Sequence, residues 1–209
     1  MLQTFRGMTG QRRPRPTPSG QVPPRPAPVA LPVTAPAAAR AAALEAVVPL
    51  LRTPRTILRA PRLADFDHLH AITGTDRAVF EGGPSTPAET WSDLCGRTAT
   101  WLLRGHGLWT VETRAGDVAG FVLIGLEPGD EEHELGWLLR PEFEGLGLAT
   151  EAATAARHHA WHALRVPSLV SYVAPGNTRS EAVARRLGAA PDGTLLDGAI
   201  TIWRHPAPE

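Results

Sequence analysis

The segment that most restricts the fold is a strand-like stretch that runs through a glycine-rich turn into a long helix. The stretch HELGWLLRP (133–141) ends at Pro141, which cannot continue a central strand. Gly145 and Gly147 follow, and a helix is predicted from Gly147 to Leu164. Such a turn directs successive backbone N–H groups, and the helix N-terminus, at one point. That point is suited to bind a phosphate or pyrophosphate.

Three kinds of phosphate-binding turn can be compared with this segment. The dinucleotide fingerprint places a third glycine where this chain has Thr150, and it needs an acidic residue near 170–171, where none occurs. A P-loop needs Gly-Lys-Ser/Thr, and the chain contains no lysine. The third kind is a loop that binds the pyrophosphate of coenzyme A.

The turn resembles motif A of the GNAT N-acetyltransferases, and GLGLATEAA (145–153) is similar to the form of that motif in the RimJ/RimL-like branch. Gly147 and Ala149 match the last two fixed positions of the motif. Glu144 departs from it, because the motif has a polar or basic residue there. An acid beside a pyrophosphate is unfavourable unless it points to solvent.

Other segments resemble the same branch in the same order along the chain. Residues 53–59 are similar to its opening strand, and residues 64–69 to its first helix. Residues 177–188 resemble motif B, an Asn-x-x-Ser sequence followed by a helix that ends in Leu-Gly. The resemblance therefore covers residues 55 to about 205.

The resemblance implies an α/β GNAT fold, with a mixed, mostly antiparallel sheet of about seven strands flanked by about four helices. The order of the predicted strands and helices favours the same mixed sheet. The strand at 133–139 is expected to splay from the strand at 168–174, so that its backbone can pair with the pantetheine of acetyl-CoA. The expected coenzyme contacts are Trp137, Leu138, Leu139, Glu144, Gly145, Leu146, Gly147, Leu148, Ala149, Thr150, Asn177 and Ser180.

Acetyl transfer to an amine needs a base, a polarised carbonyl and a proton for the departing thiolate. Glu134 is the candidate base, on the strand where the resembling branch often has an acid; the alternative is a strand-end carboxylate in water. Many relatives place a tyrosine in the motif B helix, but Ala184 stands at the corresponding position. The proton donor is then Ser180, a water molecule, or no dedicated group.

The candidate acceptor-binding residues are Glu81, in the loop between the first two helices of the domain, and Trp109. The alternatives are a solvated loop residue and a core tryptophan. His158 and His162 are four residues apart on a helix, yet helix surface is the expectation and no metal is expected.

Residues 1–54 differ in composition from the rest of the chain. They hold seven arginines and one acid, Glu45, and their first part is rich in proline. We expect a flexible arm that the fold does not need, with a possible short helix at 36–48, followed by the acetyltransferase domain at 55–206. A basic arm that touches RNA or another anionic partner is the alternative.

The function expected from the sequence is transfer of acetyl from acetyl-CoA to a primary amine, either a protein N-terminus or a small molecule. The alternative is a catalytically silent module that binds coenzyme A. The chain has one cysteine, Cys95, and no apolar run long enough to span a membrane. We therefore expect a cytoplasmic monomer or homodimer. Residues 55–209 hold fourteen arginines and twenty acids, so nucleic acid is not an expected partner of the domain.

Overall fold

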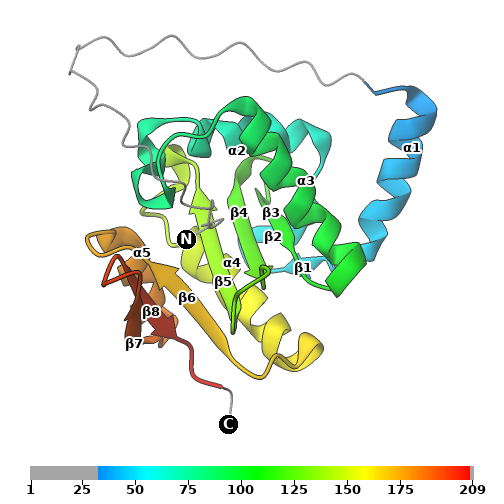
Figure 1. Ribbon diagram of the computed structural model, residues 1–209. Helices are drawn as coiled ribbons and strands as arrows, with labels where there is room; N and C mark the ends of the chain where they lie inside the picture. The colour runs from blue at the N-terminus through cyan, green and yellow to red at the C-terminus, as the bar shows by residue number, and fades with distance from the viewer. Residues whose placement is uncertain (1–32, 208–209) are drawn as a thin grey trace, which may run out of the picture.

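A computed structural model describes residues 33–207 of the chain. Its core is an eight-stranded sheet with the spatial order β1-β2-β3-β4-β5-β6-β8-β7 (Figure 1). Neighbouring strands are antiparallel except β5 and β6, which are parallel. The strands are β1 (Leu51–Arg52), β2 (Thr56–Arg59), β3 (Leu108–Thr113), β4 (Val118–Gly125), β5 (His133–Leu139), β6 (Leu169–Val173), β7 (Ala190–Leu195) and β8 (Ile200–Arg204).

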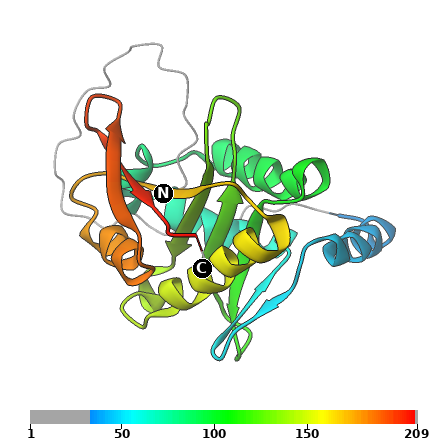
Figure 2. The ribbon, with the colours of Figure 1, turned by 90° about the horizontal axis from the view of Figure 1, so that it is seen from below.

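Helices cover both faces of the sheet, as the view from below shows (Figure 2). One face packs against α2 and α3 through a cluster that includes Phe66, Leu94 and Phe121. The other packs against α4 through small residues such as Ala152 and Ala156, which allow a close approach. The α-helices of the described residues are α1 (Ala35–Leu44), α2 (Phe66–Thr73), α3 (Pro87–Arg104), α4 (Leu148–His159) and α5 (Thr178–Arg186).

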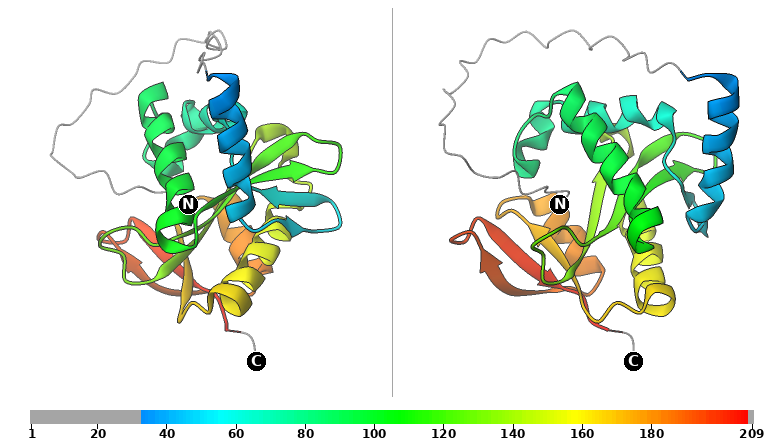
Figure 3. Two further views of the ribbon diagram at one scale, coloured as in Figure 1. Left: turned by 90° about the vertical axis from the view of Figure 1, so that its right-hand side faces the viewer. Right: turned by 45° about the vertical axis from the view of Figure 1, so that its right-hand side comes forward.

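The expected α/β class and mixed sheet are confirmed, with one strand more than expected. Helix α3 begins at a capping box, where Thr86 and Glu89 satisfy each other's backbone N–H groups. The helix predicted to run from Gly147 to Leu164 is α4 followed by a π-helical turn at Ala160–Leu164. The possible short helix at 36–48 is α1, which stands beside α3 (Figure 3).

The additional strand lies inside the segment that the sequence assigned to the arm. Leu51 pairs with Leu58 across β1 and β2, and Val48 is buried in the core. The indole Nε1 of Trp109 donates a hydrogen bond of 2.8 Å to the carbonyl of Pro49. The expected boundary at residue 54 is therefore too late, because a two-residue strand gives little periodicity to detect. Residues 1–32 of the expected arm lie outside the described residues.

The parallel pair β5 and β6 separates soon after it forms. Only His133 with Leu169 and Glu134 with Val170 are in register. Beyond Glu134, β5 remains paired with β4 as far as Leu139 but has no partner in β6. The expected splay of the motif A strand is thus present.

Buried hydrogen bonds among Leu135, Ser171 and His205, here called the bracket, connect the two strands where the gap opens. The hydroxyl of Ser171, on β6, donates to the carbonyl of Leu135, on β5, over 2.6 Å. It therefore accepts from Nε2 of His205, 2.9 Å away, which assigns the proton of the imidazole to that nitrogen. Burial, with a smaller effect of the charge on Arg157, lowers the pKa of His205 to about 4. The histidine in the bracket is therefore neutral near pH 7, because burial disfavours its charged form.

A chain that starts at Thr53 should be less stable than one that starts at Val33. It loses the burial of Val48 and leaves the N–H of Trp109 without its partner, which together cost about 3 kcal/mol. The midpoint of thermal unfolding should fall by roughly 6–12 °C. Equal melting temperatures for the two chains would contradict the packing of residues 48–52 on the domain.

His205 should make the fold sensitive to acid. The pKa of His205 is lower in the folded protein than the ordinary value of 6.5. Between pH 6.5 and pH 4, the unfolded chain therefore binds a proton at this histidine and the folded chain does not. Stability should fall as the pH drops from 6.5 towards 4, by on the order of 3 kcal/mol from this group.

Chemical denaturation of the wild type and His205→Gln between pH 7 and pH 4 measures this contribution, since glutamine keeps a donor but does not titrate. His158→Gln, an exposed histidine on α4, is the control. Parallel stability curves for the wild type and His205→Gln would show that the bracket does not need a neutral imidazole.

Candidate functional site

The glycine turn that connects β5 with α4 has the backbone shape expected from the sequence. Gly145 and Gly147 have φ values of 73° and 78°, in the left-handed region that favours glycine. Gly147 is also the N-cap of α4, and no side chain caps that end of the helix. The first N–H groups of a helix have no partner within it, so this end of α4 is suited to an anion.

The turn is fixed from behind by the segment that leads into β2. Glu151, in the first turn of α4, accepts hydrogen bonds from the hydroxyl of Thr53 and from the backbone N–H and Nε of Arg55, at 2.6, 2.8 and 2.6 Å. Arg55 also donates to the carbonyl of Leu146 over 2.8 Å. Burial alone would raise the pKa of Glu151, but these hydrogen bonds outweigh it and lower the pKa. The loop is therefore held before any ligand arrives.

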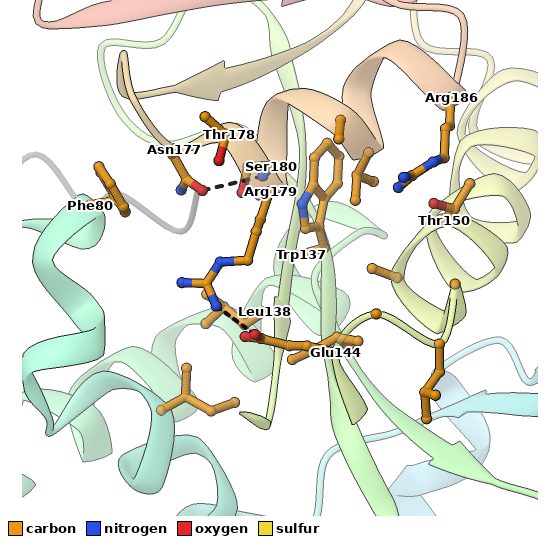
Figure 4. Close-up of a pocket in the computed structure, with 18 of the residues that line it drawn as sticks. Phe80, Trp137, Leu138, Glu144, Thr150, Asn177, Thr178, Arg179, Ser180 and Arg186 are labelled. Atoms are coloured by element: carbon orange, nitrogen blue, oxygen red, sulfur yellow. Dashed lines mark hydrogen bonds and ion pairs between the residues drawn. The ribbon is translucent and has the colours of Figure 1, made fainter. Parts of the chain in front are cut away.

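A cleft of about 1000 Å³ lies where β5 leaves β6 (Figure 4). Its lining comes from the free part of β5, the glycine turn, the start of α5 and the connection between α2 and α3. All the residues expected to contact the coenzyme line this cleft except Leu148, whose side chain is buried in the core. Only the backbone of Leu148 is available to a ligand, as part of the first turn of α4.

Asn177 and Ser180 form the start of α5 on one wall of the cleft (Figure 4). The side-chain oxygen of Asn177 accepts a hydrogen bond of 3.2 Å from the backbone N–H of Ser180, so Asn177 caps the helix. Ala184 is fully buried one turn further on, so no side chain there can give a proton to a thiolate.

Glu144 does not point freely to solvent. Its carboxylate pairs with Arg77, from the connection between α2 and α3, and with Arg179, from the first turn of α5. All three side chains line the cleft. Neither arginine was predicted from the sequence. Arg179 lies inside the Asn-x-x-Ser segment and could have been found there, whereas no sequence pattern connects residue 77 with residue 144.

Glu134 lies at the closed end of the gap, on the last residue pair that joins β5 to β6. Alternation places Glu134, Gly136 and Leu138 on one face of β5, and Leu138 packs with residues of α2 and α3. Glu134 is 5% exposed. Burial raises the pKa of Glu134 to about 7, against the smaller opposing effect of Arg97. This pKa is suited to a general base.

The phenol of Tyr172 belongs to the same region. Tyr172 follows Val170 by two residues on β6, so the two side chains share a face, and Val170 is paired with Glu134. Burial raises the pKa of Tyr172 to about 12, with further increases from the charges of Asp130 and Glu134. The phenol therefore keeps its proton near neutral pH.

The two expected acceptor-binding residues have different positions. Glu81 is partly buried and lines the cleft beside Arg77 and Phe80, and burial raises its pKa. Trp109 does not line the cleft, and its expected role is wrong. It is fully buried in the core, edge-on to Trp101 with ring centroids 4.5 Å apart, because its face of β3 packs towards α4.

Residues 33–207 have neither a membrane-spanning helix nor a cluster of metal ligands. None of the helices described there is long and apolar enough to cross a membrane. In the same range, no three histidine, cysteine or acidic side chains gather as a metal site would need. The rings of His158 and His162 lie 4.1 Å apart on the helix, and no third ligand joins them.

Comparisons with known proteins agree with this geometry. Residues 55–190 match the family model described as an acetyltransferase (GNAT) domain. Over 91 residues, the chain is 31% identical to the "Putative ribosomal N-acetyltransferase YdaF" of Bacillus subtilis (strain 168). That match spans 43% of this chain and half the length of the curated relative.

Solved structures share the whole fold. An acetyltransferase from Agrobacterium tumefaciens str. C58 is 38% identical with a TM-score of 0.72, over 76% of this chain and 95% of that one. The fold of RimL, described as a ribosomal L7/L12 alpha-N-protein acetyltransferase in complex with coenzyme A, matches with a TM-score of 0.62 at 19% identity, over 76% of this chain and 98% of that one. The chain belongs to the GNAT acetyltransferase family.

Proposed function

We propose that the chain transfers an acetyl group from acetyl-CoA to a primary amine. The observation that carries this proposal is the cleft between β5 and β6, which has unpaired strand backbone at one end and the glycine turn at the other. A thioester on a long amide-containing arm, attached to a pyrophosphate, has the shape and charge that such a cleft can hold.

The coenzyme would lie along the free part of β5. The backbone of Trp137–Leu139, which has no partner in β6, would pair with the pantetheine amides as an added strand does. The N–H groups of residues 145–150 would hold the pyrophosphate. This places the acetyl group towards the closed end of the gap, near Glu134.

The residues at that end have the properties that direct transfer requires. Glu134, with a pKa of about 7, would accept a proton from the ammonium, directly or through water. The free amine would then attack the thioester carbonyl, polarised by a backbone N–H near Trp137–Leu138. When the C–S bond breaks, the thiolate would take a proton from Ser180 or from water.

The acceptor would be an α-amine of a protein N-terminus or a small-molecule amine. YdaF is described as ribosomal and RimL as acting on L7/L12, which favours a protein N-terminus. The buried carboxyl of Glu134 and the partly buried Glu81 suit a cationic amine that must lose its proton before it reacts. We propose a cytoplasmic protein, since Cys95 is the only cysteine of the chain.

A second candidate function is a module that binds coenzyme A without catalysing transfer. It is favoured by the buried Ala184, which stands where many relatives have a tyrosine that can donate a proton. Release of free thiol in the presence of an amine panel separates the two. Acceptor-dependent thiol release supports the enzyme, and binding without release supports the silent module.

Gly147→Asp should weaken acetyl-CoA binding by at least about 100-fold. Aspartate is strained at a φ of 78°, and it adds a negative charge where the pyrophosphate should lie. Calorimetric titration measures the affinity. Gly116→Asp, at a positive φ in the β3–β4 turn, is the matched control. Unchanged affinity in Gly147→Asp would exclude the turn as the coenzyme site.

Glu134→Gln should lower kcat by about 10²–10⁴-fold and leave acetyl-CoA affinity unchanged, because glutamine cannot accept the proton. In the wild type, the rate should rise with pH through about 7, where Glu134 becomes ionised, and this limb should be missing from the variant. Glu131→Gln, an exposed acid in the preceding loop, is the control. An active Glu134→Gln enzyme with the wild-type pH profile would refute the role of this carboxylate.

A further inference from the structure

We propose that Arg77 and Arg179 bind phosphate groups of coenzyme A, and that Glu144 occupies these arginines as an internal stand-in for phosphate until the coenzyme displaces it. The proposal rests on the function proposed above and adds coenzyme ligands that lie outside the glycine turn.

The first observation is the arrangement of the three side chains. One carboxylate oxygen of Glu144 accepts from Nη2 of Arg77, and the other accepts from Nη1 of Arg179 over 2.5 Å (Figure 4 shows the second pair). The three residues come from separate parts of the fold: the α2–α3 connection, the glycine turn and α5. Two guanidinium groups that converge on one small anion form the geometry that also binds phosphate.

The second observation is the place of this carboxylate. Glu144 directly precedes Gly145, and both line the cleft with Gly147 and Thr150. A pyrophosphate held by the N–H groups of this turn would lie close to the Glu144 carboxylate and be repelled by it. Moving the carboxylate away would remove the repulsion and release two arginines beside the incoming phosphates.

The third observation is that water reaches the ion pairs. The side chains of Arg77, Glu144 and Arg179 are 34%, 29% and 61% exposed. Ion pairs with this degree of exposure stabilise a fold only slightly, so separating them costs little. Coenzyme phosphates carry more negative charge than one carboxylate and can accept both arginines at once, so the exchange favours the coenzyme.

The other arginines next to the turn already have partners that brace the fold. Arg55 binds Glu151 and the carbonyl of Leu146. Arg140 binds Glu142 and the carbonyl of Val118. The chain has no lysine, and the arginines of residues 33–207 that line the cleft are Arg77, Arg179 and Arg186.

The exchange would also change how the two sides of the cleft are connected. Arg77 belongs to the 3₁₀ segment Asp76–Glu81, whose Phe80 and Glu81 line the same cleft. In the coenzyme-free protein, the ion pair between Arg77 and Glu144 connects this segment with the turn before α4. With coenzyme bound, Arg77 would bind the phosphates in place of Glu144.

Calorimetry with three ligands tests the proposal on the full chain. Coenzyme A has a pyrophosphate and a 3′-phosphate, dephospho-coenzyme A has the pyrophosphate alone, and pantetheine has neither. Glu144→Gln should bind coenzyme A about 3- to 10-fold more tightly than the wild type, because a competing anion is lost. The gain should vanish with pantetheine. Its size with dephospho-coenzyme A identifies which phosphate the arginines meet.

The matched control is Glu142→Gln, which removes the same charge at a position two residues before Glu144. The carboxylate of Glu142 pairs with Arg140 and does not line the cleft. This variant should leave all three affinities unchanged. An equal gain in both variants would reduce the effect to overall charge and overturn the proposal.

Arg77→Ala and Arg179→Ala in the Glu144→Gln background separate phosphate binding from simple neutralisation of Glu144. Each should weaken coenzyme A binding by about 3- to 30-fold and leave pantetheine binding unchanged. Arg→Gln replacements serve if an alanine variant melts below the wild type. Equal coenzyme A affinity with and without the arginines would overturn the proposal and leave the proposed function intact. Failure of every variant, wild type included, to bind coenzyme A would overturn both.

Discussion

The structure depends on the short pairing of two parallel strands. β5 and β6 share two residue pairs and then separate, while β5 stays attached to β4 along its length. The separation leaves part of β5 without a strand partner on its β6 side among the described residues, which a fold tolerates if other groups can satisfy that backbone. The cleft, the carboxyl of Glu134 at its closed end and the glycine turn at its open end all follow from this divergence.

Two sets of hydrogen bonds keep the gap in a defined shape. At the closed end, Ser171 connects the carbonyl of Leu135 with the neutral imidazole of His205. At the open end, Glu151 holds α4 to the segment before β2 through Thr53 and Arg55. Both sets are anchored by residues far away in the sequence, so the cleft is built before the coenzyme binds, which reduces the ordering cost of binding.

Local sequence patterns predicted the parts of the site that depend on neighbouring residues. The glycine turn before α4 and the Asn-x-x-Ser segment that opens α5 each rest on a few consecutive residues, whose backbone preferences are strong. The alternation of side chains along β5, which places Glu134, Gly136 and Leu138 on one face, is equally a local property.

Features that depend on tertiary packing could not be predicted in the same way. Alternation does not say which face of β3 meets α4, so Trp109 was assigned to the acceptor pocket although it lies in the core. β1 has two residues and follows Pro49, too short a segment to show a period. The pairing of Glu144 with Arg77 joins residues 67 positions apart, and only the fold brings them together.

The most direct test is a crystal structure of the protein with acetyl-CoA. The account predicts pantetheine hydrogen-bonded to the backbone of Trp137–Leu139, the pyrophosphate on the N–H groups of residues 145–150, and the thioester carbonyl within a few ångströms of the closed end of the gap. A coenzyme bound elsewhere, with β5 and β6 still open and empty, would contradict it.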